Sequence, residues 1–170
     1  EKAEKKVIAS GLPASPGAAS GKVTFSAEDS ERLRELQQNT ILVRVETSPE
    51  DINGMHAASG ILTSRGGMTS HAAVVARGMG KPCVSGSNEI KIDYENKLFR
   101  SKEYVVREGD VITIDGGSGK AMLGEVPTVK PNMSGDFLKL MSWADKFRKL
   151  KVRTNSETPI DTKIARDFGA

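Results

Sequence analysis

Two glycines, two hydroxyl side chains and a histidine stand together at 66–71, directly before an apolar run of helical character. Glycine lets the backbone approach a ligand closely because it has no Cβ. Thr69 or Ser70 could cap the helix by accepting one of its first backbone N–H groups. The free amides and the helix dipole at that end favour a bound anion. These residue types in this order indicate a site for a phosphate group.

The residue of this stretch that could react is His71. An imidazole nitrogen is nucleophilic when neutral, and histidine is neutral for much of the time near pH 7. We therefore predict that His71 is a nucleophile that carries a phosphoryl group. The residues predicted to orient the phosphate through amides or hydroxyls are Gly66, Gly67, Thr69 and Ser70.

Two arginines flank the stretch and could contact the phosphate. Arg65 directly precedes the glycine pair, and Arg77 lies six residues beyond the histidine. Either could equally be a plain surface residue. Phosphoryl transfer depends mainly on positioning and charge neutralisation. A helix dipole contributes only about 0.3–2 kcal/mol, so the helix start would assist the reaction without supplying the whole reduction of the barrier.

Regular elements must hold the histidine in place. The apolar run 60–64 predicts a strand, the loop follows at once, and a helix is expected from about Ser70 to Gly78. Gly78, Gly80 and Pro82 end that helix, and 82–85 predicts another strand. His71 would thus lie just beyond the carboxyl end of a strand, where open α/β sheets bind ligands.

The residues before the loop predict two further strands and two helices. The strands are expected at 22–26 and 41–45, with a helix at 27–36 that turns Leu33 and Leu36 inward. Ser48 and Pro49 begin a second helix, in which His56 is a plain helix residue and not a metal ligand. The segment 11–21 is rich in Gly, Pro, Ser and Ala, which predicts an irregular extended path or a linker.

The residues after the loop change character. Short alternating runs at 88–93, 102–106, 110–115 and 120–124 predict strands at hairpin spacing. The glycines at 116–119 indicate a β-turn, because no helix pattern and no Gly-Lys-Ser/Thr follow them. Beyond a boundary at 127–131, we expect a helix at 134–150 with one apolar, core-facing stripe, a strand at 151–155 and a helix at 158–168 capped by Thr158.

Composition limits the classes of function. The 170 residues contain 25 basic and 22 acidic side chains, and the surplus of three lies entirely in 134–170, which is no nucleic-acid footprint. No apolar run is long enough to span a membrane. The single cysteine, Cys83, lies in an apolar context that predicts a buried structural thiol and a reducing intracellular compartment, either the cytoplasm or an organelle such as a chloroplast or glycosome.

The sequence from Gly66 to Gly86 resembles the phosphohistidine signature of the pyruvate phosphate dikinases, a family of phosphoenolpyruvate-utilising enzymes. Met68 favours this family over phosphoenolpyruvate synthase and the sugar phosphotransferase enzyme I, which usually have arginine there. Residues 9–21 and 143–155 resemble the segments that flank this domain in the family, so the resemblance covers nearly the whole chain.

The resemblance implies an α/β fold with a swivelling β/β/α phosphohistidine domain at 1–126. A linker and connecting helix would follow at 127–150, and 151–170 would be the first βα unit of a (β/α)8 barrel that binds phosphoenolpyruvate or pyruvate. The Gly- and Pro-rich segment 11–21 and the boundary at 127–134 are candidate hinges. In some members of the family, the threonine that corresponds to Thr69 is a regulatory phosphorylation site.

The resemblance also implies a function. The histidine would be pyrophosphorylated and then phosphorylated, and would move the group between an ATP/phosphate site and a pyruvate/phosphoenolpyruvate site on other domains of a homodimeric parent enzyme. This chain would bind no cofactor, Mg²⁺ would accompany the nucleotide elsewhere, and the fragment alone would not complete the reaction. The alternatives are the same domain of phosphoenolpyruvate synthase or enzyme I, and a non-catalytic binding module in which His71 merely begins a helix.

Overall fold

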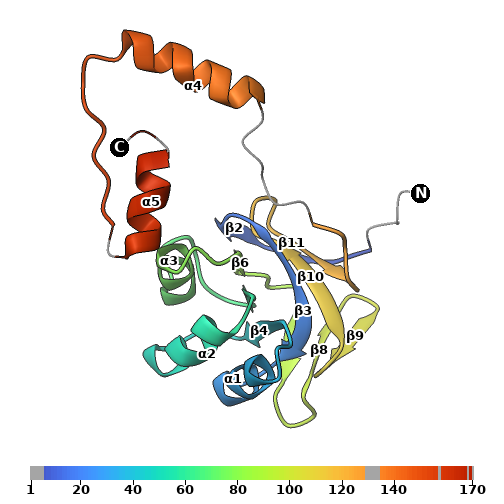
Figure 1. Ribbon diagram of the computed structural model, residues 1–170. Helices are drawn as coiled ribbons and strands as arrows, with labels where there is room; N and C mark the ends of the chain where they lie inside the picture. Colours follow the sequence, from blue (N-terminus) through green and yellow to red (C-terminus); the bar gives the residue numbers. More distant parts are fainter. Residues whose placement is uncertain (1–5, 129–134, 157, 168, 170) are drawn as a thin grey trace. The chain divides into compact units, whose positions relative to one another are not determined.

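The computed structural model describes residues 6–128, 135–156, 158–167 and 169. The chain divides into two compact units, Glu1–Thr128 and Val129–Ala170, and each unit is described by itself. All strands of the described residues, and the helices that pack on them, belong to the first unit (Figure 1). The domain boundaries expected between residues 126 and 127 and between residues 150 and 151 remain predictions.

Eight strands of the first unit form one sheet in the order β1-β11-β10-β3-β4-β5-β6-β2. The neighbours from β3 to β6 are parallel, and all other neighbours are antiparallel. The strands are β1 (Val7–Ser10), β2 (Leu12–Ser15), β3 (Ala18–Thr24), β4 (Thr40–Arg44), β5 (Gly60–Thr63), β6 (Cys83–Ser85), β10 (Val111–Asp115) and β11 (Lys120–Leu123).

Three helices cover one face of this sheet: α1 (Ala27–Glu35), α2 (Ile52–Ala57) and α3 (His71–Gly78). Leu42 and Ile61 of the central strands pack with Met55 of α2 in the core between the sheet and these helices. A short 3₁₀ turn, Pro49–Asp51, precedes α2, and the Asp51 carboxylate accepts the Ser48 N–H at 2.9 Å. The expected Ser-Pro helix start is confirmed, and Asp51 completes it.

A second sheet of three strands, β7 (Lys91–Asp93), β8 (Leu98–Ser101) and β9 (Tyr104–Arg107), lies on the other face. Phe99 and Val106 from this sheet pack with Val43 and Ile112 of the large sheet. Successive residues of a strand point to opposite faces, so β4 supplies Val43 to this core and Leu42 to the helical one. The β/β/α layering implied by the resemblance is confirmed.

Two local predictions for the first unit are wrong. The segment 11–21 is neither irregular nor a linker, because it forms β2 and the start of β3, and hydrogen bonds join these strands to β6 and β10. A hinge in this segment stays a prediction. Leu36 does not point inward but is 63% exposed, because it lies beyond the end of α1, whose buried residues are Ala27 and Ser30. The structure also contains β8, which the sequence did not predict.

The second unit contains α4 (Gly135–Phe147) and α5 (Pro159–Asp167). Thr158 Oγ1 accepts the Asp161 N–H at 3.1 Å, which confirms the predicted cap. Two expectations are wrong. Residues 151–156 form no strand, and α4 buries none of its residues, so its apolar stripe faces no core within the described part of the chain. A strand needs a hydrogen-bonded neighbour, and these residues have none.

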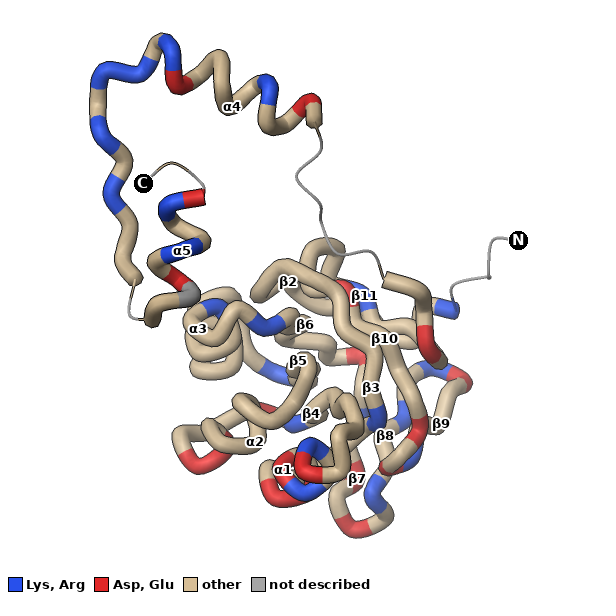
Figure 2. The backbone as a smooth tube through the Cα atoms, viewed as in Figure 1, with Lys and Arg blue, Asp and Glu red and all other residues tan. Residues whose placement is uncertain are grey.

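Charges of both signs are interspersed along the surface of the first unit, for example on α1 (Figure 2). In the residues that the structure describes, no helix is both long and apolar enough to cross a membrane. The same residues contain no group of three or more His, Cys, Asp or Glu side chains that could hold a metal ion.

Candidate functional site

The loop between β5 and α3 carries the predicted site. Its first glycine, Gly66, has φ +107°, and a Cβ there would come within 3.0 Å of the Ser70 side chain. Gly66 is therefore required by the path of the loop. A Cβ at Gly67 would meet nothing within 4 Å, so the space beside this residue is open to a ligand. The two glycines serve different purposes, which the sequence did not distinguish.

Ser70 is the cap of the helix that begins with His71. Its backbone is extended (φ −64°, ψ 159°), and its Oγ accepts the Ala73 N–H at 3.4 Å. The sequence left Thr69 and Ser70 as alternatives for this position, and the structure selects Ser70. Thr69 is exposed beside it. Its predicted roles in orienting phosphate and in regulation stay predictions, and its side chain is accessible for either.

His71 is the first residue of α3 and is partly buried. Its Nδ1 lies 3.1 Å from Oγ1 of Thr47, a residue that is 92% buried in the loop between β4 and α2. This contact fixes the orientation of the ring, because only one ring nitrogen can face Thr47. The other nitrogen, Nε2, remains for chemistry. Sequence reasoning missed Thr47, although its place just beyond the neighbouring parallel strand is a signal that could have identified it.

Arg77 reaches the loop from the last turn of α3. Its Nη2 donates to the Met68 carbonyl, and its Nε donates to the Ala73 carbonyl at 3.1 Å. These bonds tie the middle of the loop to the helix. The predicted contact between Arg77 and phosphate stays a prediction, but the guanidinium does lie at the loop.

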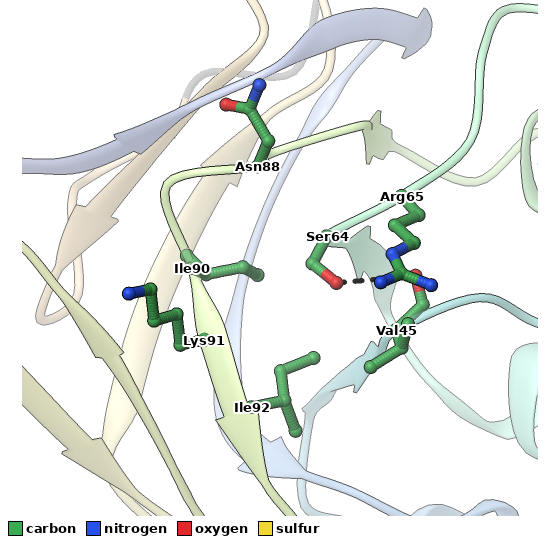
Figure 3. A pocket seen from close by; sticks show the side chains of 7 residues that line it. All are labelled: Val45, Ser64, Arg65, Asn88, Ile90, Lys91 and Ile92. Atoms are coloured by element: carbon green, nitrogen blue, oxygen red, sulfur yellow. Dashed lines mark hydrogen bonds between the residues drawn. The ribbon is translucent and has the colours of Figure 1, made fainter.

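Arg65 lies on a different side of the loop. It lines a pocket of about 290 Å³ between the ends of β4 and β5 and the segment that leads into β7 (Figure 3). Within the pocket wall, Ser64 Oγ donates to the Val45 carbonyl at 3.5 Å. His71 does not line this pocket. The seven lining residues are Val45, Ser64, Arg65, Asn88, Ile90, Lys91 and Ile92.

Cys83 lies beneath α3 in the helical core and is fully buried. Burial raises the pKa of its thiol to about 12, against a smaller opposing effect of the Arg77 charge. A thiol with such a pKa is protonated at neutral pH and is a poor nucleophile. The prediction of a structural thiol is confirmed. The second histidine, His56, is exposed on α2, and its backbone carbonyl accepts hydrogen bonds from Arg34 and Lys81.

Comparison with known proteins identifies the relatives of this chain. Residues 36–119 match the family described as "PEP-utilising enzyme, mobile domain". The chain is 59% identical over 168 residues to the pyruvate, phosphate dikinase of Rhizobium meliloti, a match that covers 99% of this chain and 19% of that protein. The corresponding enzyme of Clostridium symbiosum is 59% identical over 165 residues, or 97% of this chain and 19% of that one.

A plant relative and a solved structure extend the comparison. The chloroplastic pyruvate, phosphate dikinase of Flaveria trinervia is 55% identical over 164 residues, covering 96% of this chain and 17% of its own. An NMR structure of Enzyme I (nEIt) resembles 67% of this chain and 38% of its own at 21% identity, with a TM-score of 0.39. The chain spans about a fifth of the length of the curated relatives it matches. It belongs to the family of PEP-utilising enzymes and contains their mobile domain.

Proposed function

We propose that this chain carries a phosphoryl group on Nε2 of His71. One contact carries the proposal, the 3.1 Å approach of His71 Nδ1 to Thr47 Oγ1. A hydroxyl oxygen can accept a hydrogen bond from Nδ1–H, and in that tautomer Nε2 has a free lone pair. The alternative tautomer would place a proton on Nε2 and block attack. Because a hydroxyl can also donate, we assign Thr47 Oγ1 the acceptor role, which gives the reactive tautomer.

The transfer step follows from this tautomer. The Nε2 lone pair attacks phosphorus, a P–N bond forms, and the P–O bond to the leaving group breaks with its electron pair. Nδ1 keeps its proton, so the ring becomes cationic while it donates to Thr47. The phosphoramidate can then pass the group to a second acceptor by the reverse sequence. Open space at Gly67 and the first amides of α3 support the phosphoryl oxygens.

The relatives suggest donors and acceptors. Their name, pyruvate, phosphate dikinase, and identities of 55–59% favour a parent protein in which phosphoenolpyruvate and pyruvate are exchanged at one site and ATP and phosphate at another. His71 would be pyrophosphorylated at the nucleotide site and would reach the other site by a movement of the domain. Other parts of the protein would supply both sites, and Mg²⁺ would bind with the nucleotide. The same identities favour this reaction over that of phosphoenolpyruvate synthase or enzyme I.

The test uses the 170-residue chain with phosphoramidate, a small phosphoryl donor that needs no second protein. We expect ³¹P NMR to report one phosphohistidine, labile in acid, stable in alkali and bonded through Nε2. The signal should vanish in His71→Asn and persist in His56→Asn, which removes the other histidine of the chain. A signal that survives in His71→Asn would refute the proposal. In the parent protein, the same variant should stop formation of pyruvate from phosphoenolpyruvate.

A non-catalytic binding module predicts a different result. In that case neither histidine would react faster than a free imidazole, and both single variants would lose about half of the signal. The partial burial of His71 against Thr47, compared with the exposed ring of His56, makes the two rings distinguishable. A preference for His71 over the more accessible His56 would exclude the binding module.

A further inference from the structure

Beneath the reactive loop lies a buried serine, Ser85, at the end of β6. It is fully buried, and its Oγ lies 3.2 Å from Thr63 Oγ1 on β5 and 3.4 Å from Ser70 Oγ. Ser70 caps the helix that begins with His71, and Thr63 Oγ1 donates to the Arg65 carbonyl at 2.7 Å. Ser85 therefore links the two ends of the loop through one hydroxyl.

The hydrogen bonds of these hydroxyls form one connected chain. Thr63 Oγ1 donates to the Arg65 carbonyl at 2.7 Å and to Ser85 Oγ at 3.2 Å, so the two acceptors share its one proton. Between Ser85 and Ser70 either hydroxyl can be the donor. Ser70 Oγ also accepts the Ala73 N–H. The chain thus runs from the loop's first carbonyl to the first turn of α3.

The backbone of the loop rests directly on the same strand end. A Cβ on Gly66 would lie 3.1 Å from Ser85 Oγ. The residue after Ser85 is Gly86, and a Cβ there would lie 2.5 Å from the Gly66 carbonyl oxygen. The loop thus has no free space below it. Any shift of Ser85 would move the loop, and with it the start of the helix that carries His71.

We propose that Ser85 is a positioning residue for the phosphoryl-carrying histidine, because its hydroxyl holds Ser70 and Thr63 in register and so fixes both ends of the loop. This inference rests on the proposed function of His71. Ser85 touches neither the phosphoryl group nor the ring, and acts through the geometry of the loop. Thr63 belongs to the same device, since it passes the link on to the Arg65 carbonyl.

The experiment compares phosphorylation rates with phosphoramidate in the 170-residue chain at 25 °C. Ser85→Ala should slow phosphorylation of His71 by at least about 2- to 12-fold, the range for one of its two neutral hydrogen bonds. The matched control is Ser101→Ala. Ser101 is also buried and bonds one acceptor, the Ile8 carbonyl at 2.6 Å, but it lies in the small sheet. The control should lower the melting temperature comparably and leave the rate unchanged.

A second pair of variants tests the same inference if Ser85→Ala does not fold. Thr63→Val keeps the shape of the side chain and removes the hydroxyl, whereas Thr63→Ser keeps the hydroxyl. Thr63→Val should be slow and Thr63→Ser should restore most of the rate, which a purely structural role would not produce. Equal rates for Ser85→Ala, Ser101→Ala and the unmodified chain would overturn the inference. If the unmodified chain itself gave no phosphohistidine at His71, the proposed function would fail instead.

Discussion

The pair formed by His71 and Thr47 decides what the imidazole can do. A histidine at a helix start can direct either ring nitrogen outward, and the amides of the helix do not choose between them. Thr47 makes the choice by holding Nδ1 at 3.1 Å. Since Thr47 is buried, water competes little for its hydroxyl. The reactivity of the ring therefore depends on a side chain 24 positions away in the sequence.

Removal of the Thr47 hydroxyl should change the tautomer ratio of His71 while the protein stays folded. We expect Thr47→Val to slow phosphorylation of His71 by about 2- to 12-fold, which corresponds to about 0.5–1.5 kcal/mol for one hydrogen bond. Thr47→Ser should retain most of the rate. ¹⁵N NMR of the labelled imidazole should report a larger fraction of the tautomer with its proton on Nε2 in Thr47→Val. An unchanged tautomer ratio and rate would contradict the role given to Thr47.

The loop between β5 and α3 depends on the strand beside it as much as on its own residues. Arg77 holds the middle of the loop from above, and the end of β6 supports it from below. Gly66 adopts a positive φ so that the chain can turn over this support. Several backbone groups of this short loop have fixed partners, among them the carbonyls of Arg65 and Met68 and the Ser70 N–H, and these bonds restrain it. Rigidity keeps the ring, the cap and the helix amides in one arrangement.

Gly80 and Gly86 have nearly the same φ, so alanine substitutions at the two positions distinguish the effect of backbone strain from the effect of a clash below the loop. Gly86 has φ +67° and Gly80 has φ +64°, but only at Gly86 would a Cβ strike another group, the Gly66 carbonyl oxygen. Gly80→Ala should cost about 1–2 kcal/mol, the strain of a left-handed residue, and leave the phosphorylation rate intact. Gly86→Ala should lower stability further and slow phosphorylation. Denaturant unfolding and the phosphoramidate assay measure the two effects, and equal behaviour of the variants would count against the close packing described here.

The residues that the structure brings together around His71 all lie in the first unit. Burial of both faces of the large sheet, one by helices and one by the small sheet, holds β4, β5 and β6 in register. The carboxyl ends of these strands lead to Thr47, the histidine loop and the Ser85–Gly86 support. Each core consists of residues from this unit, between Ile8 and Ala121. Its stability should therefore not depend on residues 129–170.

Truncation tests this independence. A chain that ends at Thr128 should melt within about 2 °C of the 170-residue chain, equivalent to roughly 0.5 kcal/mol, and should be phosphorylated at the same rate. A chain that ends at Asp115 loses β11, including the buried Ala121 and Met122, and should not fold cooperatively. Calorimetry and circular dichroism distinguish the outcomes. A drop of more than about 10 °C on truncation at Thr128 would mean that the second unit stabilises the first.

The sequence determined the local features of this protein. The glycine that the loop requires, the helix that begins at His71 and the alternating strands all follow from backbone preferences and periodicity over a few residues. The helical turn that begins after Ser48 and leads into α2, and the cap at Thr158, were predicted for the same reason. These features depend on neighbours in the chain, so one sequence is enough to recognise them.

Only the tertiary structure decided which distant groups meet. The order β4-β5-β6 in the sheet brings Thr47, Thr63 and Ser85 to the histidine loop, and no local pattern records that order. For the same reason, 11–21 indicated an irregular extended path or a linker although it supplies β2 and part of β3, and Leu36 was expected to point inward although it lies beyond the end of α1. Burial and long-range hydrogen bonding depend on which surfaces pack together. The sequence therefore pointed to His71 as the candidate nucleophile, and the fold identified the side chains that lie against it.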